Sequence, residues 1–531
     1  MADDRAEVYA ALTFDVEEKR TDSKEPALED EGSNLLFVAG QEDLKDLSVA
    51  DELYEIPADK GRVILYSPLS KACLLINRPA VDLINSVRDK RAIELDKRTI
   101  AFLNYLILYG IVGLRDAEAE KVAEAAGKGE GKVRDELIYA PTGVSICPTT
   151  DCNLRCIYCY ASGGERVKYM DFDLARHAID FVVDNAVKRK AKKTNILFHG
   201  GGEPMMAFDL IKRSVDHMRM RAKERGLECS FSIGTNLFYG EERLNYLIEN
   251  FSGATVSLDG TKDIHDFQRP AADGSSSFDK ITDNLKVLDE KGLSYGLRTT
   301  VTKRNINRLN EIVEFFVTNF KARSYSFEPL VLAHRAVDTR LEGVEYPEFM
   351  EAFLKAREVA KRHGRDLSTT CIDLSKMDSK FCGAMGEGFW VTPDGLVTTC
   401  AEVLDLADPL ARYFIIGRFD RDRDDFVFDY EKIKILKKRT INEIAACKAC
   451  FARYHCSGSC PVKLMRQGAE YMQTAGSPGS HCEPVKRVIA KKLLEMLTKE
   501  ESKITEDDYI KLGEPEKLSE ADFRSEKPPI S

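Results

Sequence analysis

Three cysteines lie close together in the stretch CNLRCIYCY, at Cys152, Cys156 and Cys159, directly after an apolar segment. Three thiolates do not complete the tetrahedral shell of a zinc ion, but they suit a cubane iron–sulfur cluster with one iron left open for another ligand. A zinc or structural site with a distant fourth ligand is the alternative. The motifs further along the chain favour the iron–sulfur cluster.

A second set of cysteines begins at Cys382 and ends at Cys482, with Cys400, Cys447, Cys450, Cys456 and Cys460 between them. Within it, the segment FWVTPDGLVTT at 389–399 predicts a hairpin that turns at its Pro-Asp-Gly and delivers Cys400 from the far strand. A zinc ribbon is the alternative for the C-x2-C-x5-C-x3-C part. Such clustering in a chain of 14 cysteines indicates metal binding rather than disulfides.

Size and charge limit the classes of protein that need to be considered. A chain of 531 residues exceeds a single core, and its 43% hydrophobic content suits a globular protein. The net charge of -10 argues against a nucleic-acid surface. The first residues lack the apolar core of a signal peptide, and no apolar run is long enough to cross a bilayer. We therefore predict a cytoplasmic protein with no nucleic-acid or membrane partner.

The cysteine motif at 152–159 lies in a region that alternates short apolar strands with amphipathic helices, from residue 137 to residue 335. This pattern predicts an α/β fold, a partial (βα)6 TIM-like barrel whose site gathers where strands end. Helices are expected at 173–187 and 279–291. Strands are expected at 143–147, 195–199, 229–234, 254–258, 295–301 and 324–328.

The C-x3-C-x2-C loop after the first strand, followed by Gly201-Gly202-Glu203-Pro after the second, resembles the radical S-adenosylmethionine (SAM) superfamily. In that family the three thiolates hold a [4Fe–4S] cluster, and SAM chelates the open iron through its amino and carboxylate groups. The resemblance implies that Tyr158 lies near the adenine. Gly201 and Gly202 would let the backbone approach the ligand, and Glu203 would accept a hydrogen bond from the methionine ammonium.

Further SAM contacts are implied at the ends of the next strands. Thr235 and Asn236 follow the third strand. By the same resemblance, Ser257 and Asp259 at the end of the fourth strand would face the ribose or the methionine. Arg269 would pair with the carboxylate, because its planar guanidinium makes bidentate bonds to carboxylates.

The seven downstream cysteines resemble the SPASM extension of radical SAM enzymes, which carries two auxiliary [4Fe–4S] clusters. The resemblance assigns Cys447, Cys450, Cys456 and Cys482 to one cluster, and Cys382, Cys400 and Cys460 to the other. Two cubanes need eight ligands, so one is missing. Either Cys371 is the eighth ligand or one iron stays open, and the total expected is three [4Fe–4S] clusters.

The remaining sequence predicts the domain layout. A hairpin at 62–77 followed by helices at 80–87 and 97–109 resembles the small α+β, winged-helix-like domain that recognises leader peptides by strand addition; a structural or dimerisation domain is the alternative. The predicted domains are a loose segment at 1–33, this small domain at 34–116, a linker at 117–136, the barrel at 137–335, a connecting helical region at 336–370, a cysteine-rich iron–sulfur domain at 371–484, and a C-terminal helix and charged tail at 485–531.

The function implied is that of a radical SAM/SPASM oxidoreductase, a maturase of a ribosomal precursor peptide or protein. It would form a thioether or carbon–carbon crosslink and take electrons from a flavodoxin or ferredoxin. Formylglycine formation, as in anaerobic sulfatase-maturing enzymes, is an alternative. Those enzymes have an aspartate directly after the second SPASM cysteine, where this chain has Ala401; Glu402 follows, but on a strand it would point to the opposite face. A non-catalytic iron–sulfur, peptide-binding partner is the other alternative, and no catalytic side chain is assigned.

Overall fold

The computed structural model describes residues 10–14, 38, 43–45, 47–58, 61–114, 139–370, 372, 377–468 and 482–499. The chain divides into two compact units, one of residues 1–132 with 489–531 and the other of residues 133–488. The boundary at residue 132 falls inside the predicted linker at 117–136, whose residues lie outside the described part of the chain. None of the described helices is long and apolar enough to cross a membrane.

The first unit contains a four-stranded sheet in the order β1-β5-β4-β3 and a short pair, β2 with β6. The predicted hairpin is confirmed, since β4 and β5 pair antiparallel. Both predicted helices form, and each begins at a side chain that caps its first backbone N–H groups, Asn77 for α1 and Asp96 for α2. The elements of this unit are β1 Ala10–Phe14, η1 Asp43–Lys45, β2 Leu47–Val49, β3 Tyr54–Pro57, β4 Val63–Ser67, β5 Ala72–Ile76, α1 Arg78–Arg88, α2 Lys97–Leu108 and β6 Val112–Leu114.

One element of this unit was missed in the sequence. We assigned no structure to 1–33, but Ala10–Phe14 forms β1 and pairs parallel with β5 along its whole length. Five residues with one short apolar run give little periodicity, so their strand depends on a partner far along the chain. In the sheet order, β3 is left as the second edge strand.

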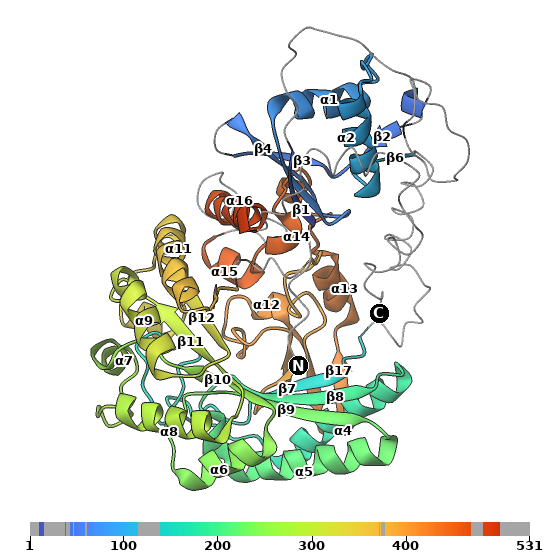
Figure 1. The fold of residues 1–531 in the computed structure, drawn as a ribbon. Coiled ribbons are helices and arrows are strands. Elements are labelled where there is room, and N and C mark those ends of the chain that lie inside the picture. Colours follow the sequence, from blue (N-terminus) through green and yellow to red (C-terminus); the bar gives the residue numbers. More distant parts are fainter. Residues whose placement is uncertain are drawn as a thin grey trace. The chain divides into compact units, whose positions relative to one another are not determined.

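The second unit is built on one 11-stranded sheet, ordered β13-β12-β11-β10-β9-β8-β7-β14-β15-β16-β17. All six predicted strands of the 137–335 region form, parallel and side by side in chain order. Helices α4, α5, α6 and α8 run along one side of these strands (Figure 1). The elements are β7 Gly143–Ile146, α4 Phe172–Lys188, β8 Lys193–Phe198, η4 Pro204–Ala207, α5 Phe208–Arg225, β9 Glu228–Thr235, α6 Glu241–Asn250, β10 Gly253–Ser257, α7 Lys262–Gln268, α8 Phe278–Lys291, β11 Tyr295–Val301, η5 Ile306–Arg308, α9 Leu309–Asn319 and β12 Ser324–Pro329.

The cysteine-rich region continues the same sheet. The predicted hairpin at 389–399 is confirmed as β14 and β15, and β14 pairs parallel with β7, the first strand of the parallel set. The three segments that we separated at 137–335, 336–370 and 371–484 thus share one compact unit. The remaining elements are α10 Arg335–Asp338, α11 Tyr346–Arg362, β13 Leu367–Ser368, β14 Trp390–Val391, β15 Leu396–Thr398, α12 Ala411–Phe414, β16 Ile415–Asp420, β17 Asp425–Phe428, α13 Tyr430–Lys438, η6 Ala445–Cys447, α14 Arg453–Cys456, α15 Pro461–Arg466 and α16 Cys482–Lys499.

Candidate metal centre

The three clustered cysteines lie on the cysteine loop, which we define as residues 147–169, between β7 and α4. Two arginines shape this loop through its carbonyl groups. Arg155 donates to the carbonyl oxygens of Cys152 and Gly164, at 2.6 and 3.2 Å. Arg335, at the start of α10, donates to those of Cys156 and Gly163, at 3.1 and 2.9 Å. Neither arginine was singled out in the sequence, because their partners are backbone atoms brought near by the fold.

Each of the three sulfur atoms receives at least one N–H group. The backbone N–H of Leu154 donates to Cys152 Sγ at 3.5 Å, and that of Gly163 donates to Cys159 Sγ at 3.4 Å. The guanidinium of Arg269 lies 3.8 Å from Cys156 Sγ. Such donors stabilise thiolates, and they are the groups that tune the sulfur ligands of iron–sulfur clusters.

Burial opposes charge on Cys152 and Cys156 when no metal ion balances them. It raises the pKa of Cys152 to about 12, and the neighbouring Cys156 adds to the rise. Burial also raises the pKa of Cys156, to about 11. The charge of Arg269 lowers the pKa of Cys156 but does not outweigh burial. A cation or a cationic cluster bound among these thiols would make the thiolate form favourable.

Gly201 and Gly202 pack directly against the cysteine loop. A Cβ atom on Gly202 would lie 1.8 Å from the carbonyl oxygen of Asp151, and one on Gly201 would lie 2.5 Å from Cys147 Sγ. The backbone N–H of Gly202 donates to the carbonyl of Thr149 at 2.9 Å. The glycines therefore bring this turn against the loop itself, a reason for glycine that our expectation of a close ligand contact did not include.

Glu203 is buried behind the same turn and accepts three hydrogen bonds. Its donors are Thr235 Oγ1 at 2.7 Å, the backbone N–H of Asn236 at 2.7 Å and the backbone N–H of Met205 at 3.2 Å. Burial raises the pKa of Glu203 to about 7 despite these donors. Asn236 in turn donates to Asn153 at 2.8 Å, so the expected residues at 201–203 and 235–236 come together against the cysteine loop.

Asp259 differs from our expectation of a ligand contact. Its carboxylate is fully buried, and it is engaged by the hydroxyl of Tyr158, by Gln268 at 2.8 Å and by an ion pair with Arg269 at 3.0 Å. Burial alone would raise the pKa of Asp259, but Arg269, His265 and the hydrogen bonds from Tyr158 and Thr300 together outweigh it and hold the pKa below its ordinary value. Asp259 thus anchors Arg269 and Tyr158 rather than facing a ligand. The cause is helix α7, which returns Arg269 to the end of β10.

The anchored pair lies next to Cys156. The Arg269 guanidinium lies over the Tyr158 ring, 5.2 Å from its centroid, and both side chains are nearly buried. The carboxylate that we expected Arg269 to bind is, in this structure, that of Asp259. Ser257 is half-buried at the end of β10, and its contact with SAM stays a prediction.

The seven downstream thiols lie in two sets of electrostatic neighbours, and their assignment to two clusters stays a prediction. Burial raises the pKa of Cys456 to about 12, and three thiols beside it, Cys447, Cys450 and Cys482, add to the rise. Burial raises the pKa of Cys460 to about 12 as well, with contributions from Glu402 and from Cys382. Burial is the largest cause that raises the pKa of Cys400, and the charges of Glu402 and Cys460 raise it further. Cys371, the candidate eighth ligand, lies outside the described residues.

Backbone N–H groups again point at these sulfurs. The N–H of Gly458 donates to Cys456, that of Ala452 to Cys450 and that of Glu402 to Cys400. Ser457, Gly458 and Ser459 are all left-handed, with φ of 47°, 74° and 61°. A left-handed conformation costs a serine about 1 kcal/mol. Arg439, fully buried, offsets this cost by donating to the carbonyls of Gly458 and Ser459 at 2.9 and 3.3 Å.

Glu402 corrects a further expectation. We assumed that Ala401 and Glu402 continue a strand and point to opposite faces, but β15 ends at Thr398 and both residues form a turn. The Glu402 side chain lines a pocket and is an electrostatic neighbour of Cys400 and Cys460. No pattern in the sequence indicated this turn beyond the hairpin.

This pocket is a cavity of about 620 Å³ within the second unit. One wall comes from the cysteine loop and the turn after β8, including Cys147, Tyr160 and Gly201. The opposite wall comes from the cysteine-rich region, including Asp394 and Glu402. Residues of both regions thus line one cavity, with Cys147 as the cysteine among them.

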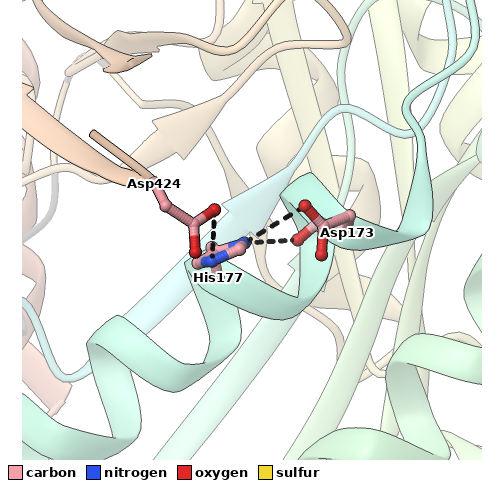
Figure 2. A group of neighbouring side chains, drawn as sticks. All are labelled: Asp173, His177 and Asp424. Carbon is pink, nitrogen blue, oxygen red and sulfur yellow. Dashed lines mark hydrogen bonds and ion pairs between the residues drawn. The ribbon is translucent and has the colours of Figure 1, made fainter. Parts of the chain in front are cut away.

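Another group of metal-binding side chain types lies outside this pocket. Asp173 and His177 on α4 and Asp424 in the β16–β17 turn converge on one another (Figure 2). However, Arg176 donates to Asp173 at 2.7 Å, and the two aspartates are more than half exposed. A cation already neutralises this group, so it forms an ion-pair network that fastens the β16–β17 turn to α4.

The family model of the radical SAM superfamily matches residues 146–316. An uncharacterized protein of Methanocaldococcus jannaschii is 31% identical over 185 residues, covering 34% of this chain and 60% of that protein. A cysteine-type anaerobic sulfatase-maturating enzyme of Clostridium novyi is 24% identical over 332 residues, covering 59% of this chain and 85% of that enzyme.

Among solved structures, polyhistidine-tagged anSMEcpe with bound AdoMet superposes with a TM-score of 0.51. It is 18% identical, and the match covers 70% of this chain and 98% of that one. Likeness at this identity establishes the α/β fold with its large mixed sheet.

Proposed function

We propose that this chain, whose residues 146–316 form a radical SAM domain, is a maturase that modifies a ribosomal precursor peptide or a protein. The modification proposed is a thioether or carbon–carbon crosslink. The observation that carries the proposal is the pocket of about 620 Å³, because its walls come from the cysteine loop on one side and the cysteine-rich region on the other. A substrate side chain held there would lie among residues of both regions.

Within this function, Cys152, Cys156 and Cys159 hold a [4Fe–4S] cluster. SAM bound to it supplies the adenosyl radical chemistry that removes a hydrogen atom from the substrate. The protein shapes the site around it. Glu203 accepts hydrogen bonds at the turn after β8, Arg269 and Tyr158 stand beside Cys156, and Arg155 and Arg335 fix the loop.

The cysteine-rich region would act as a SPASM extension. Cys447, Cys450, Cys456 and Cys482 would hold one auxiliary cluster, and Cys382, Cys400 and Cys460 would hold the other. Forming a crosslink removes two hydrogen atoms from the substrate, so one electron remains after the first hydrogen is taken and one proton leaves. The auxiliary clusters would accept that electron, and a flavodoxin or ferredoxin would supply electrons to the radical centre.

The first unit would recognise the substrate. Its strand β3 is an edge of the four-stranded sheet, while β1 covers the other edge at β5. An edge strand offers a row of unpaired main-chain groups, and a leader peptide could add to it as a further strand.

Formylglycine formation on a sulfatase is the second candidate, favoured by the similarity to the cysteine-type anaerobic sulfatase-maturating enzyme of Clostridium novyi. Against it stands Ala401, which replaces the expected aspartate after Cys400. The products separate the two candidates. A crosslinked peptide loses two hydrogen atoms and keeps its sulfur, whereas formylglycine formation from cysteine replaces the thiol with an aldehyde.

The test begins with the anaerobically reconstituted enzyme, SAM and dithionite. We expect 5′-deoxyadenosine and methionine, and we expect neither from the variant with Cys152, Cys156 and Cys159 all changed to Ala. Peptides encoded by short neighbouring reading frames are then added, and their masses are followed. Reconstituted enzyme that binds iron but releases no 5′-deoxyadenosine would overturn the proposal and leave a non-catalytic iron–sulfur partner. An aldehyde product would instead support the second candidate.

A further inference from the structure

Glu402 lies next to Cys400 and Cys460, two of the three thiols that lack a fourth partner. Its backbone is fixed on both sides. The N–H donates to Cys400 Sγ, and the carbonyl accepts from Arg466 Nη2 at 3.0 Å. Its Oε2 atom, however, is buried and has no hydrogen-bond partner among the described residues. A carboxylate oxygen that is withdrawn from water without a donor or a cation is costly, so this oxygen needs a partner that the polypeptide does not supply.

The cations near Glu402 are engaged by other carboxylates. Lys463, on α15 directly after Cys460, forms an ion pair with Glu328 at 2.9 Å. Arg466, on the same helix, forms one with Asp408 at 2.8 Å, and it meets Glu402 only at the carbonyl. The positive charges on this helix therefore neutralise Glu328 and Asp408. Burial would raise the pKa of both carboxylates, but these cations help to lower each pKa to about 2.

Glu402 and the thiols occupy one place in the fold. Glu402 is an electrostatic neighbour of both Cys400 and Cys460, and Cys382 is a neighbour of the same two thiols. Three thiolates bind three irons of a cubane, and the fourth iron then needs a ligand from elsewhere. Carboxylate oxygen is an established ligand for iron in proteins.

We propose that Glu402 is the fourth protein ligand of the auxiliary cluster held by Cys382, Cys400 and Cys460. The inference rests on the proposed function, which supplies the auxiliary clusters. It replaces the two options that the sequence left open, a thiolate from Cys371 or an iron without a protein ligand. Glu402 also lines the pocket on which the proposed function rests.

The experiment isolates the auxiliary clusters in the full-length chain by changing Cys152, Cys156 and Cys159 to Ala. In this background, iron per chain, electron paramagnetic resonance of the reduced protein and midpoint potentials are measured for Glu402→Gln and Glu402→Asp. The matched control is Glu387→Gln, which removes an exposed carboxylate near Cys382 that pairs with Lys380 at 2.9 Å. Cys371→Ala tests the competing ligand.

Glu402→Gln replaces an anionic ligand with a neutral one, so the reduced form of one cluster becomes easier to reach. We expect the equilibrium constant for reduction of that cluster to increase at least tenfold. This corresponds to a rise of about 59 mV in its midpoint potential for one electron. Its resonance spectrum should change, while the other cluster stays as in the parent. Glu402→Asp, a shorter carboxylate, should retain most of the parent spectrum, and Glu387→Gln and Cys371→Ala should match the parent.

Other outcomes overturn the inference. If Cys371→Ala gives the shift and Glu402→Gln does not, the fourth ligand is Cys371. If neither variant alters the spectrum or the potential, the iron has no protein ligand. Should Glu402→Gln fail to fold, Glu402→Ala takes its place, because it also removes the carboxylate; an unchanged spectrum and potential in Glu402→Ala would overturn the inference. A parent background that binds no iron would reject the auxiliary clusters, and hence that part of the proposed function, independently of Glu402.

Discussion

The groups that shape the cysteine loop are residues with no metal-binding chemistry of their own. Gly201 and Gly202 allow the turn after β8 to touch the loop, and Arg155 and Arg335 hold the loop's carbonyl groups. The positions of the three thiols thus depend on packing and on buried hydrogen bonds, and both can be tested by single substitutions.

Gly202→Ala should disrupt the loop. The added Cβ atom would overlap the carbonyl oxygen of Asp151, a backbone atom that cannot move without shifting Cys152. We expect a loss of about 1 to 3 kcal/mol in the free energy of unfolding, as for other overpacked sites, and loss of iron at the radical centre. Urea unfolding and iron content measure the two effects. Gly240→Ala, where a Cβ atom meets nothing within 4 Å, is the matched control; equal effects in both variants would contradict the packing argument.

Arg335→Ala removes a guanidinium that bonds to two loop carbonyls and pairs with Glu165 at 2.6 Å. The buried carbonyl oxygens lose a charged donor, so we expect a loss of about 2 kcal/mol and slower formation of 5′-deoxyadenosine by reconstituted enzyme. Arg225→Ala removes an exposed arginine whose ion pair with Asp184 spans 3.7 Å, and it should change stability by less than about 0.5 kcal/mol. Unchanged iron binding in Arg335→Ala would show that the cysteine loop keeps its conformation without the hydrogen bonds from Arg335.

At this scale the sequence predicted which thiols come together but not what holds them. The spacing of cysteines within a loop is local, so Cys152, Cys156 and Cys159 could be recognised directly. The burial of Asp259 could not, because it depends on α7 returning Arg269, Gln268 and the chain after them to the end of β10. We therefore assigned the carboxylate of Asp259 to a ligand contact, whereas in the structure it pairs with Arg269 of the protein itself.

Among elements, the joining of the cysteine-rich region to the parallel strands is the main feature that sequence patterns missed. The six parallel strands were recognised from apolar runs of the right length, and the Pro-Asp-Gly turn predicted the β14–β15 hairpin. The pairing of Trp390 with Ser145 across β14 and β7 leaves no local pattern, since it joins residues far apart in the chain. Periodicity predicts that a strand exists and leaves its partner open.

A second link between these regions is the buried ion pair between β12 and α15. Glu328 accepts from Lys463 at 2.9 Å and from Thr370. Burial would raise the pKa of Glu328, but Lys463, Arg298 and Thr370 outweigh it and lower the pKa to about 2. The pair therefore contributes stability at neutral pH and loses it as the pH falls through the acid range.

Lys463→Met should leave the Glu328 carboxylate buried without its counter-charge, at a cost of about 3 kcal/mol in the free energy of unfolding at pH 7. The difference from wild type should narrow as the pH falls from about 4 towards about 2, because Glu328 is then protonated in both states. The double variant Glu328→Gln with Lys463→Met should recover most of the loss. Urea unfolding of the metal-free proteins measures this. A pH-independent difference, or a double variant less stable than the single one, would contradict a coupled pair.

On the scale of the whole molecule, the proposed chemistry and the proposed substrate recognition belong to different compact units. The unit of residues 133–488 contains all ten cysteines that we propose as ligands, and the first unit contains the small sheet with β3 at its edge. The boundary was visible in the sequence as a change from patterned strands to an Ala-, Glu-, Lys- and Gly-rich stretch at 117–132. If the first unit recognises the substrate, binding and chemistry should respond separately to changes in the substrate.

Removal of the leader segment from the precursor peptide should therefore raise KM while leaving kcat largely unchanged. Main-chain hydrogen bonds to an edge strand contribute to binding in the ground state and the transition state alike, and a loss of about 1.4 kcal/mol corresponds to tenfold in kcat/KM. We expect a decrease of at least about tenfold, measured as modified peptide against peptide concentration, with 5′-deoxyadenosine formed without peptide as the internal control. Free leader peptide added in excess should inhibit turnover of the intact precursor by competing for the same strand. Equal KM values for the intact and leaderless peptides, together with no inhibition by free leader, would assign substrate recognition to the pocket in the second unit alone.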